Sequence, residues 1–311
     1  MNLKVIHNLN LLEALCAVKS PSGEERAMKD FILEWVEKNA ANWRCQPEII
    51  QGEDFQDCLI LVFGKPKVAA FAHMDTTGFT VRYQNQLLPI GGPEVLPGDI
   101  LVGHDDLGAI ECTADLDVEY RLYYQFGRAI QPGTSLSYKP NFSLKGNYIT
   151  SPYLDNRAGI YNLLRLAETL QNGILAFSCW EEHGGGSIPY LTKYIYEKFT
   201  IKRMLISDVT WVTDGVHHGE GVAISMRDRN IPRRSYIDQI IALARENSIK
   251  YQLEVEAEGS SDGRELQQSP YPVDWCFVGA PQTDPHSSHE KIHLQDLHHM
   301  LELYKVLFEK L

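Results

Sequence analysis

The sequence lacks the features that mark membrane, secreted and nucleic-acid-binding proteins. No apolar run approaches the roughly 20 residues that span a bilayer. The stretch Met1-Asn2-Leu3-Lys4-Val5-Ile6-His7-Asn8 lacks the apolar core of a signal peptide. No block of basic residues occurs, and the formal net charge is -12, so nucleic acid is not an expected partner. We therefore expect a cytoplasmic protein that binds neither a membrane nor nucleic acid.

Cysteine is scarce and shows no metal-binding spacing. The six cysteines are Cys16, Cys45, Cys58, Cys112, Cys179 and Cys276. None forms a CxxC pair, and most stand beside apolar residues, as reduced thiols in a protein core do. We expect reduced thiols and no cysteine ligand to a metal.

The patterns that are present indicate two kinds of structure. With 311 residues, 44% of them hydrophobic, the chain is long enough for one large domain and a smaller one. Helical and strand patterns alternate in 1–75 and again in 148–311, which predicts an α/β domain made of both segments. Residues 76–147 instead hold short stretches rich in Val, Ile and Tyr, separated by Gly and Pro. They predict an inserted all-β domain, a small barrel.

Two local signals predict where elements begin and end. Ser22, with Glu25 three residues further on, forms a capping-box pattern for the helix that follows. A short strand from Met204 to Ser207 is expected to end at Asp208.

A pair of adjacent carboxylates, Glu181-Glu182, follows the apolar run Ile174 to Phe177 and precedes three glycines. The run predicts a buried strand, and the glycines allow a tight turn after it. Neighbouring residues at a strand end point in different directions, so one carboxylate can ligate a metal while the other handles a proton. An isolated pair of this kind is more often solvated in a loop, so the functional interpretation of the pair depends on the other candidate residues.

Further candidate ligands stand where other strands or helices begin or end. In chain order they are His73, Asp155, Glu182, Asp208 and His286, with Asp75 and Glu181 beside two of them. In open α/β sheets, sites form beyond the carboxyl ends of the strands. So many carboxylates together would repel one another unless cations neutralised them. Two divalent metal ions sharing one carboxylate would do so, and this nitrogen and oxygen donor set suits Zn²⁺, Co²⁺ or Mn²⁺.

Alone, each of these residues has an ordinary structural explanation. His73 could be a core histidine with a satisfied ring, and Asp155 could be a simple helix N-cap, which negative charge favours.

The combined motifs resemble the dinuclear zinc aminopeptidases of the glutamyl and tetrahedral aminopeptidase family, in the clan of cocatalytic zinc exopeptidases. The motifs cover nearly the whole chain. They are Ser20 to Glu25, Ala72-His73-Met74-Asp75, Gly91-Gly92 through Pro97-Gly98, Leu154 to Gly159, Glu181-Glu182, Asp208-Val209-Thr210 and Pro281 through Ser287. The resemblance implies a mixed central sheet between two helical layers, with the all-β insertion serving substrate access or oligomerisation.

The resemblance also implies residue roles. One metal would be held by His73, Asp155 and Asp208, and the other by Asp155, Glu182 and His286, so that Asp155 bridges them. Asp75 matches the residue that orients the ligand histidine, and Glu181 matches the general base. His289 has no counterpart in the pattern. It is either a rival to His286, which is the favoured ligand, or a residue that supports the ligands without contacting a metal.

The leading functional hypothesis is a metal-dependent aminopeptidase that hydrolyses short peptides from the N-terminus through an activated water and Glu181. A carboxypeptidase or an amidohydrolase acting on a small N-acyl metabolite is the alternative within the same clan. A non-catalytic protein stabilised by metal is a third possibility, and it predicts the loss of a ligand or of Glu181. The resemblance also implies self-association, from dimers to dodecamers.

Overall fold

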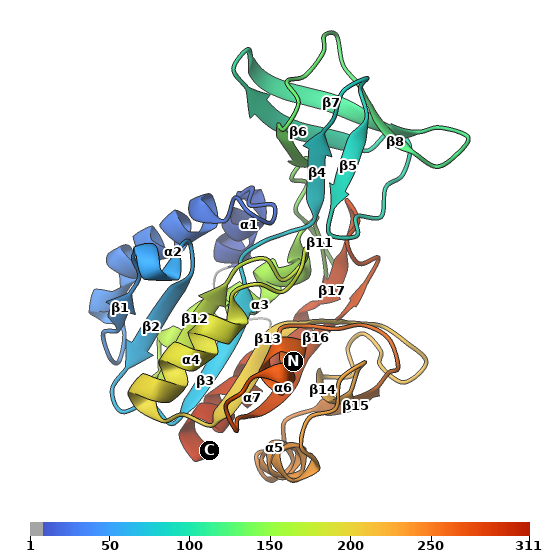
Figure 1. The fold of residues 1–311 in the computed structure, drawn as a ribbon. Coiled ribbons are helices and arrows are strands. Elements are labelled where there is room, and N and C mark those ends of the chain that lie inside the picture. Colours follow the sequence, from blue (N-terminus) through green and yellow to red (C-terminus); the bar gives the residue numbers. More distant parts are fainter. Residues whose placement is uncertain (1–8) are drawn as a thin grey trace.

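The computed structural model describes residues 9–311. The stretch Met1 to Asn8, in which the sequence predicts no signal peptide, lies outside the described residues. Within 9–311, the chain forms one mixed sheet of 11 strands, helices that cover it, and a separate antiparallel sheet of 6 strands. Figure 1 shows the second sheet projecting from one end of the first. This arrangement confirms the predicted α/β fold with an all-β insertion.

The helices are α1 (Leu9–Ala17), α2 (Arg26–Asn39), α3 (Leu154–Ala167), α4 (Ile188–Phe199), α5 (Arg234–Glu246), α6 (Gly263–Gln268) and α7 (Leu294–Lys310). Short 3-10 turns occupy Ala40–Asn42 and Glu53–Phe55. None of the helices in the described residues is both long and apolar enough to span a bilayer.

The large sheet runs in the order β1-β2-β12-β3-β13-β16-β17-β11-β10, and β14 pairs with both β15 and β16. Its strands are β1 (Glu48–Ile50), β2 (Leu59–Phe63), β3 (Val68–His73), β10 (Ser143–Lys145), β11 (Tyr148–Thr150), β12 (Gly173–Ser178), β13 (Arg203–Trp211), β14 (Val222–Arg227), β15 (Tyr251–Val255), β16 (Asp274–Thr283) and β17 (Lys291–His293). The four central neighbours β12, β3, β13 and β16 are parallel.

Helices cover the central strands, which is why those strands read as continuous apolar runs. Every residue of β2, β3 and β12 is buried, as expected for strands packed on both faces. Helix α3 packs on β3 and β13 and contacts α1 and α7, whereas α4 and α6 contact each other and pack on β12 and β16. Helix α3 connects β11 to β12, and α4 connects β12 to β13, in the opposite direction across the sheet. Because such connections are right-handed, the two helices lie on opposite faces of the sheet.

The insertion forms its own sheet and buried core. Its strands are β4 (Gly78–Val81), β5 (Leu87–Ile90), β6 (Ile100–Asp105), β7 (Gly108–Leu116), β8 (Leu122–Gln125) and β9 (Ser135–Tyr138), in the order β5-β4-β9-β6-β7-β8. A bridge between Gln86 and Tyr123 joins the two edge strands and nearly closes a barrel. Phe79, Leu101 and Leu136 are fully buried in its core.

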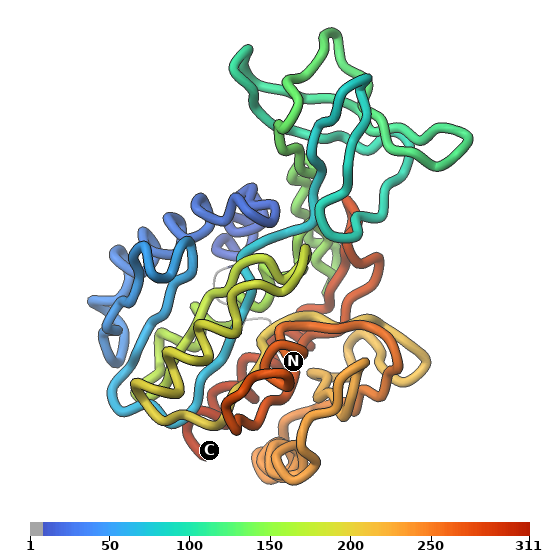
Figure 2. The backbone as a smooth tube through the Cα atoms, viewed as in Figure 1, coloured from blue at the N-terminus to red at the C-terminus, as the bar shows by residue number. Residues whose placement is uncertain are grey.

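Figure 2 shows the chain leaving the large sheet after β3 and returning to it through β10 and β11. The residue limits of the insertion, 76 and 147, stay a prediction. The strands of the small sheet lie between residues 78 and 138, while β10 and β11 pair with the large sheet.

Several local expectations were wrong. Ser22 and Glu25 form no capping box, because Ser22 Oγ donates instead to Asp75 Oδ2 and Glu25 makes no cap hydrogen bond to α2. Strand β13 does not end before Asp208 but continues to Trp211, paired with β16 throughout. The alternative explanation of Asp155 as a simple N-cap also does not hold, because the side chain that accepts a backbone N–H of the first helical turn is that of Asn156, whose Oδ1 accepts the N–H of Gly159 (2.8 Å).

Gly159 allows α3 to approach β13 directly beneath the candidate ligands. The backbone carbonyl of Ser207 accepts a hydrogen bond from Asn156 Nδ2 (2.9 Å), and Ser207 Oγ donates to the Gly159 carbonyl (3.1 Å). A Cβ at residue 159 would overlap the Ser207 carbonyl oxygen and the Asn156 side chain. These two residues adjoin Asp208 and Asp155.

We therefore expect Gly159→Ala to lower the free energy of unfolding by about 1–3 kcal/mol, the usual cost of overpacking a core. Denaturant unfolding followed by circular dichroism measures this change. Gly127→Ala is the matched control, because a Cβ at exposed Gly127 meets no atom within 4 Å. Equal stability of the two variants would contradict the packing described here.

Candidate active site

The predicted site residues gather at one edge of the large sheet. Strands β12, β3, β13 and β16 are parallel neighbours, so their carboxyl ends share this edge. His73 is the last residue of β3, and Asp208 lies near the end of β13. The pair Glu181-Glu182 follows β12, His286 follows β16, and Asp155 stands at the start of α3.

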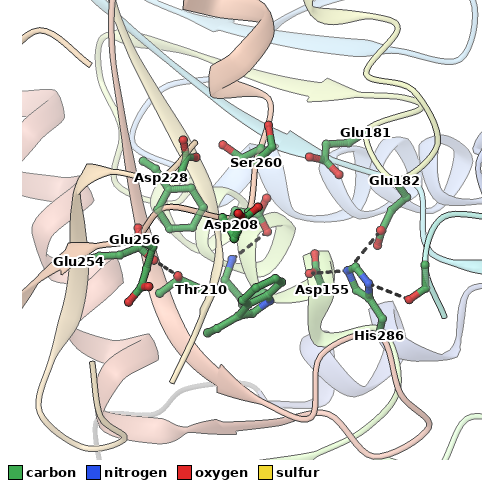
Figure 3. Close-up of a pocket in the computed structure, with 17 residues that line it drawn as sticks. Asp155, Glu181, Glu182, Asp208, Thr210, Asp228, Glu254, Glu256, Ser260 and His286 are labelled. Atoms are coloured by element: carbon green, nitrogen blue, oxygen red, sulfur yellow. Dashed lines mark hydrogen bonds and ion pairs between the residues drawn. The ribbon is translucent and has the colours of Figure 1, made fainter. Parts of the chain in front are cut away.

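Asp155 lies between the two histidines. Its Oδ1 is 3.1 Å from His73 Nε2, and its Oδ2 is 3.5 Å from His286 Nε2. His73 Nε2 also lies 3.5 Å from Asp208 Oδ2, and His286 Nε2 lies 3.4 Å from Glu182 Oε2. The structure therefore brings these five residues into two sets that share Asp155 (Figure 3).

These residues open onto a cavity of about 290 Å³, which Asp155, Glu181, Glu182, Asp208 and His286 help to line. Figure 3 shows the Glu181 carboxylate turned toward the space between Asp155, Asp208 and Glu182. A small substrate in the cavity would thus meet both the proposed ligands and the proposed base.

Asp75 has a larger structural role than orienting His73. Its side chain is fully buried, and its Oδ1 accepts the backbone N–H of Glu181 (3.1 Å). Its Oδ2 accepts the N–H of Glu182 (3.0 Å) and the hydroxyl of Ser22 (2.6 Å). His73 Nδ1 lies 3.1 Å from the Asp75 carbonyl oxygen and 3.5 Å from its Oδ1. Asp75 therefore fixes the position of His73 relative to the backbone of both glutamates.

The cluster carries more negative charge than its surroundings balance. Burial raises the pKa of Glu182 to about 8, that of Asp208 to about 6, and that of Glu181 well above its ordinary value. Burial lowers the pKa of His286, but the charges of Glu182 and Asp155 more than offset this and raise it to about 11. Burial also lowers the pKa of His73, but the charge of Asp208 and the hydrogen bonds to Asp155 and Asp208 outweigh this effect and raise it.

A divalent cation fits this donor set. Ligand atoms of His73, Asp155 and Glu182 all lie within 4.8 Å of one another. The Glu182 side chain is 4% exposed, and its Oε1 has no hydrogen-bond partner in residues 9–311. A buried oxygen without a donor is costly, and a cation removes that cost. Imidazole nitrogen and carboxylate oxygen suit Zn²⁺, Co²⁺ or Mn²⁺.

The insertion contacts the site through its backbone. His286 Nδ1 lies 3.1 Å from the carbonyl oxygen of Gly92, in the loop after β5, which fits a donated ring N–H that fixes the ring's orientation. The N–H of Glu94 donates to the His286 carbonyl (3.0 Å), and that of Gly91 donates to His183 Nδ1 (3.0 Å). Gly91 and Gly92 belong to one of the motifs found in the sequence, but the sequence did not indicate their role.

The geometry separates the two rival histidines. His286 contacts Asp155 and Glu182, whereas the His289 ring contacts Ser288 Oγ (3.3 Å) and does not line the cavity.

Sequence reasoning missed three buried carboxylates around the site. Glu290 Oε2 accepts the N–H of Asp155 (3.0 Å), and Glu25 Oε1 accepts that of Trp180 (3.1 Å). Asp262 Oδ2 accepts the hydroxyl of Ser178 (2.6 Å), beside the strand end that leads to Glu181. Burial raises the pKa of Glu25 and of Asp262 to about 7. Asp262 follows a Gly/Ser-rich stretch and Glu290 follows a His-rich one. These compositions were the features of the sequence that could have indicated the two residues.

A family model described as M42 glutamyl aminopeptidase matches residues 114–303. A comparison with curated proteins gave no significant match.

Solved structures share the fold over nearly the whole chain. An aminopeptidase from the archaeon Desulfurococcus kamchatkensis is 21% identical with a TM-score of 0.85, covering 97% of this chain and 94% of that one. The TET1 peptidase of Pyrococcus horikoshii, described as assembling into a tetrahedron or a large octahedral shell, is 20% identical with a TM-score of 0.82. That comparison covers 97% of this chain and 99% of the other.

Replacing Asp75 tests its role as the organiser of the cluster. In Asp75→Asn the side-chain amide would point its own N–H at the backbone N–H of Glu181 or Glu182, so that two donors would face each other. We expect affinity for divalent cations to fall by about 10–100-fold, the usual effect of losing an orienting partner. Chelator competition measures it. Ser22→Ala, which removes only the hydroxyl contact, should have the smaller effect; wild-type affinity in Asp75→Asn would refute this role.

Proposed function

Because the chain belongs to the M42 glutamyl aminopeptidase family, we propose that it is a metal-dependent aminopeptidase that removes N-terminal residues from short peptides. The observation that carries the proposal is the position of Asp155, which turns one carboxylate oxygen toward His73 and the other toward His286. This is the arrangement expected of a carboxylate shared by two cations, and it opens onto a cavity that Glu181 also lines.

Two cations are proposed, one held by His73, Asp155 and Asp208 and the other by Asp155, Glu182 and His286. Zn²⁺ is the first candidate, with Co²⁺ or Mn²⁺ as alternatives. When bound, such cations stabilise negative charge on the scissile carbonyl oxygen and make a water more acidic.

The protein's own residues supply the proton transfers and the positioning. Glu181 takes a proton from the attacking water and passes it to the leaving amine. Its backbone N–H is fixed by Asp75, so the carboxylate enters the cavity from a defined point. Burial raises the pKa of Glu181, which is the direction that makes a carboxylate a better proton acceptor near neutral pH.

Self-association, from a dimer to a dodecamer, is proposed on the same family grounds. The insertion presents exposed apolar side chains in its β6–β7 and β7–β8 turns, among them Leu107, Val118 and Tyr120, with 76%, 97% and 84% of their surface exposed. Light scattering from the purified chain measures the assembly.

The proposed activity is tested by assaying aminoacyl-anilides beside N-acylated amino acids. The protein is first stripped with a chelator, and Zn²⁺, Co²⁺ and Mn²⁺ are then added back separately. We expect the stripped protein to be inactive and at least one metal to restore hydrolysis of the anilides only. Hydrolysis of N-acyl amino acids instead would replace the aminopeptidase assignment with a deacylase.

The adjacent glutamates should respond differently to substitution. Glu181→Gln keeps the shape but cannot accept the proton, so kcat should fall by roughly 10² to 10⁴ while metal content stays near that of the wild type. Glu182→Ala should lose metal and activity together. Metal analysis and turnover on the same preparations separate the two. Wild-type turnover by Glu181→Gln with full metal content would falsify the proposed base.

A further inference from the structure

The cavity has a second group of carboxylates away from the candidate ligands. Asp155, Glu182 and His286 gather at one end, and Figure 3 shows Asp228, Glu254 and Glu256 together at the other. Between the two groups lie Asp208, Thr210 and Ser260. A molecule whose reacting bond lies at the first end can therefore extend a side chain toward the second.

The second group comes from a different pair of strands. Asp228 directly follows β14, Glu254 lies in β15, and Glu256 directly follows it. Strands β14 and β15 are parallel, so their carboxyl ends reach the cavity together. These carboxylates belong to neither proposed cation set.

Within residues 9–311, none of these three carboxylates forms a salt bridge with a basic side chain. Glu254 accepts a hydrogen bond from the Thr210 hydroxyl, and Asp228 accepts the N–H of Asn230. The Arg227 guanidinium donates through Nε to the backbone carbonyl oxygens of Asp228 and Glu256. A fourth lining carboxylate, Glu258, does pair with a basic side chain, that of Arg229 (2.8 Å).

Two of the three carboxylates are also poorly solvated. Asp228 and Glu254 are 8% and 5% exposed, and burial raises the pKa of both. Arg227 partly opposes this effect at Asp228, while the charges of Asp228 and Glu256 add to it at Glu254. A cationic group in this part of the cavity would offset that cost.

Apolar side chains line the cavity beside the carboxylates. Val209 and Phe277 are buried and Trp211 is partly exposed, and all three contribute to the lining. A cavity lined by both apolar side chains and carboxylates matches a side chain that has an apolar stem and a cationic head, as lysine and arginine do.

We propose that this end of the cavity binds the side chain of the substrate's N-terminal residue and selects lysine or arginine. The inference rests on the proposed aminopeptidase function. An N-terminal glutamate, which the family's name would favour, is rejected, since its carboxylate would join three others without a paired cation.

The test compares anilides of lysine, arginine, norleucine and glutamate. Norleucine has the straight side chain of a lysine without its amine, so the ratio of the two kcat/KM values isolates the charge. We expect lysine to exceed norleucine by about tenfold or more, and glutamate to be the poorest of the four.

Variants locate the preference in the cavity. Glu256→Gln and Asp228→Asn keep size and remove charge, so each should lower the lysine-to-norleucine ratio by about tenfold while norleucine turnover changes little. Glu246→Gln is the matched control, because it removes the same charge from the exposed side of α5. An unchanged ratio in both cavity variants would overturn the proposal.

A binding measurement separates this inference from the proposed function. Calorimetry with free L-lysine and L-norleucine should show tighter binding of lysine, and Glu256→Gln should remove the difference. If anilides are hydrolysed but norleucine or glutamate is preferred, the specificity is wrong and the aminopeptidase stands. If no anilide is hydrolysed with any metal, the function is wrong, and the two amino acids still decide whether the cavity selects a cation.

Discussion

The site depends on the buried carboxylate of Asp75. Burying a charge is costly unless hydrogen bonds replace the lost water, and Asp75 receives two backbone N–H groups and one hydroxyl. Burial alone would raise its pKa, but His73 and these donors lower it, so the group stays ionised. The donors come from the Glu181-Glu182 turn and from Ser22. Because a single side chain satisfies them all, β3, the turn after β12 and the N-terminal segment take their positions together.

Around Asp75, the protein concentrates acids that its own basic groups do not balance. Besides the candidate ligands, Glu290 binds the N–H of Asp155 and Asp262 binds Ser178. Burial raises the pKa of both acids. A fold that gains nothing from such a cluster would be more stable with apolar residues of similar volume. The cluster is therefore best explained by cations that the proposed function requires.

The positions of the site residues followed from the sequence because parallel strands bring their carboxyl ends to one edge. His73 and Glu182 could be identified in this way, since each follows a short apolar run. The partners that fix them could not, because Gly92 and Glu290 reach the site from loops that no local pattern places. Tertiary contacts also override local sequence signals. The pattern around Ser22 predicts a helix cap, but its hydroxyl donates to Asp75 instead. Likewise Asp208 reads as a strand end, yet pairing with β16 carries β13 on to Trp211.

The sheet order places the candidate ligands and the carboxylates proposed for selectivity on different strands. The candidate ligands stand on β3 and β13, on α3, and in the loops after β12 and β16, where Asp75 and the core fix them. The carboxylates proposed to select the substrate lie in β15, as Glu254 does, or directly after β14 and β15. Strand β14 pairs with β16 through two antiparallel residue pairs and with β15 in parallel. Glu254 contacts β13 through the Thr210 hydroxyl, whereas the donors to Asp75 come from Glu181, Glu182 and Ser22. A change of charge at the branch therefore removes none of the hydrogen bonds to Asp75. The fold can therefore keep one hydrolytic centre while its substrate preference varies with a few side chains.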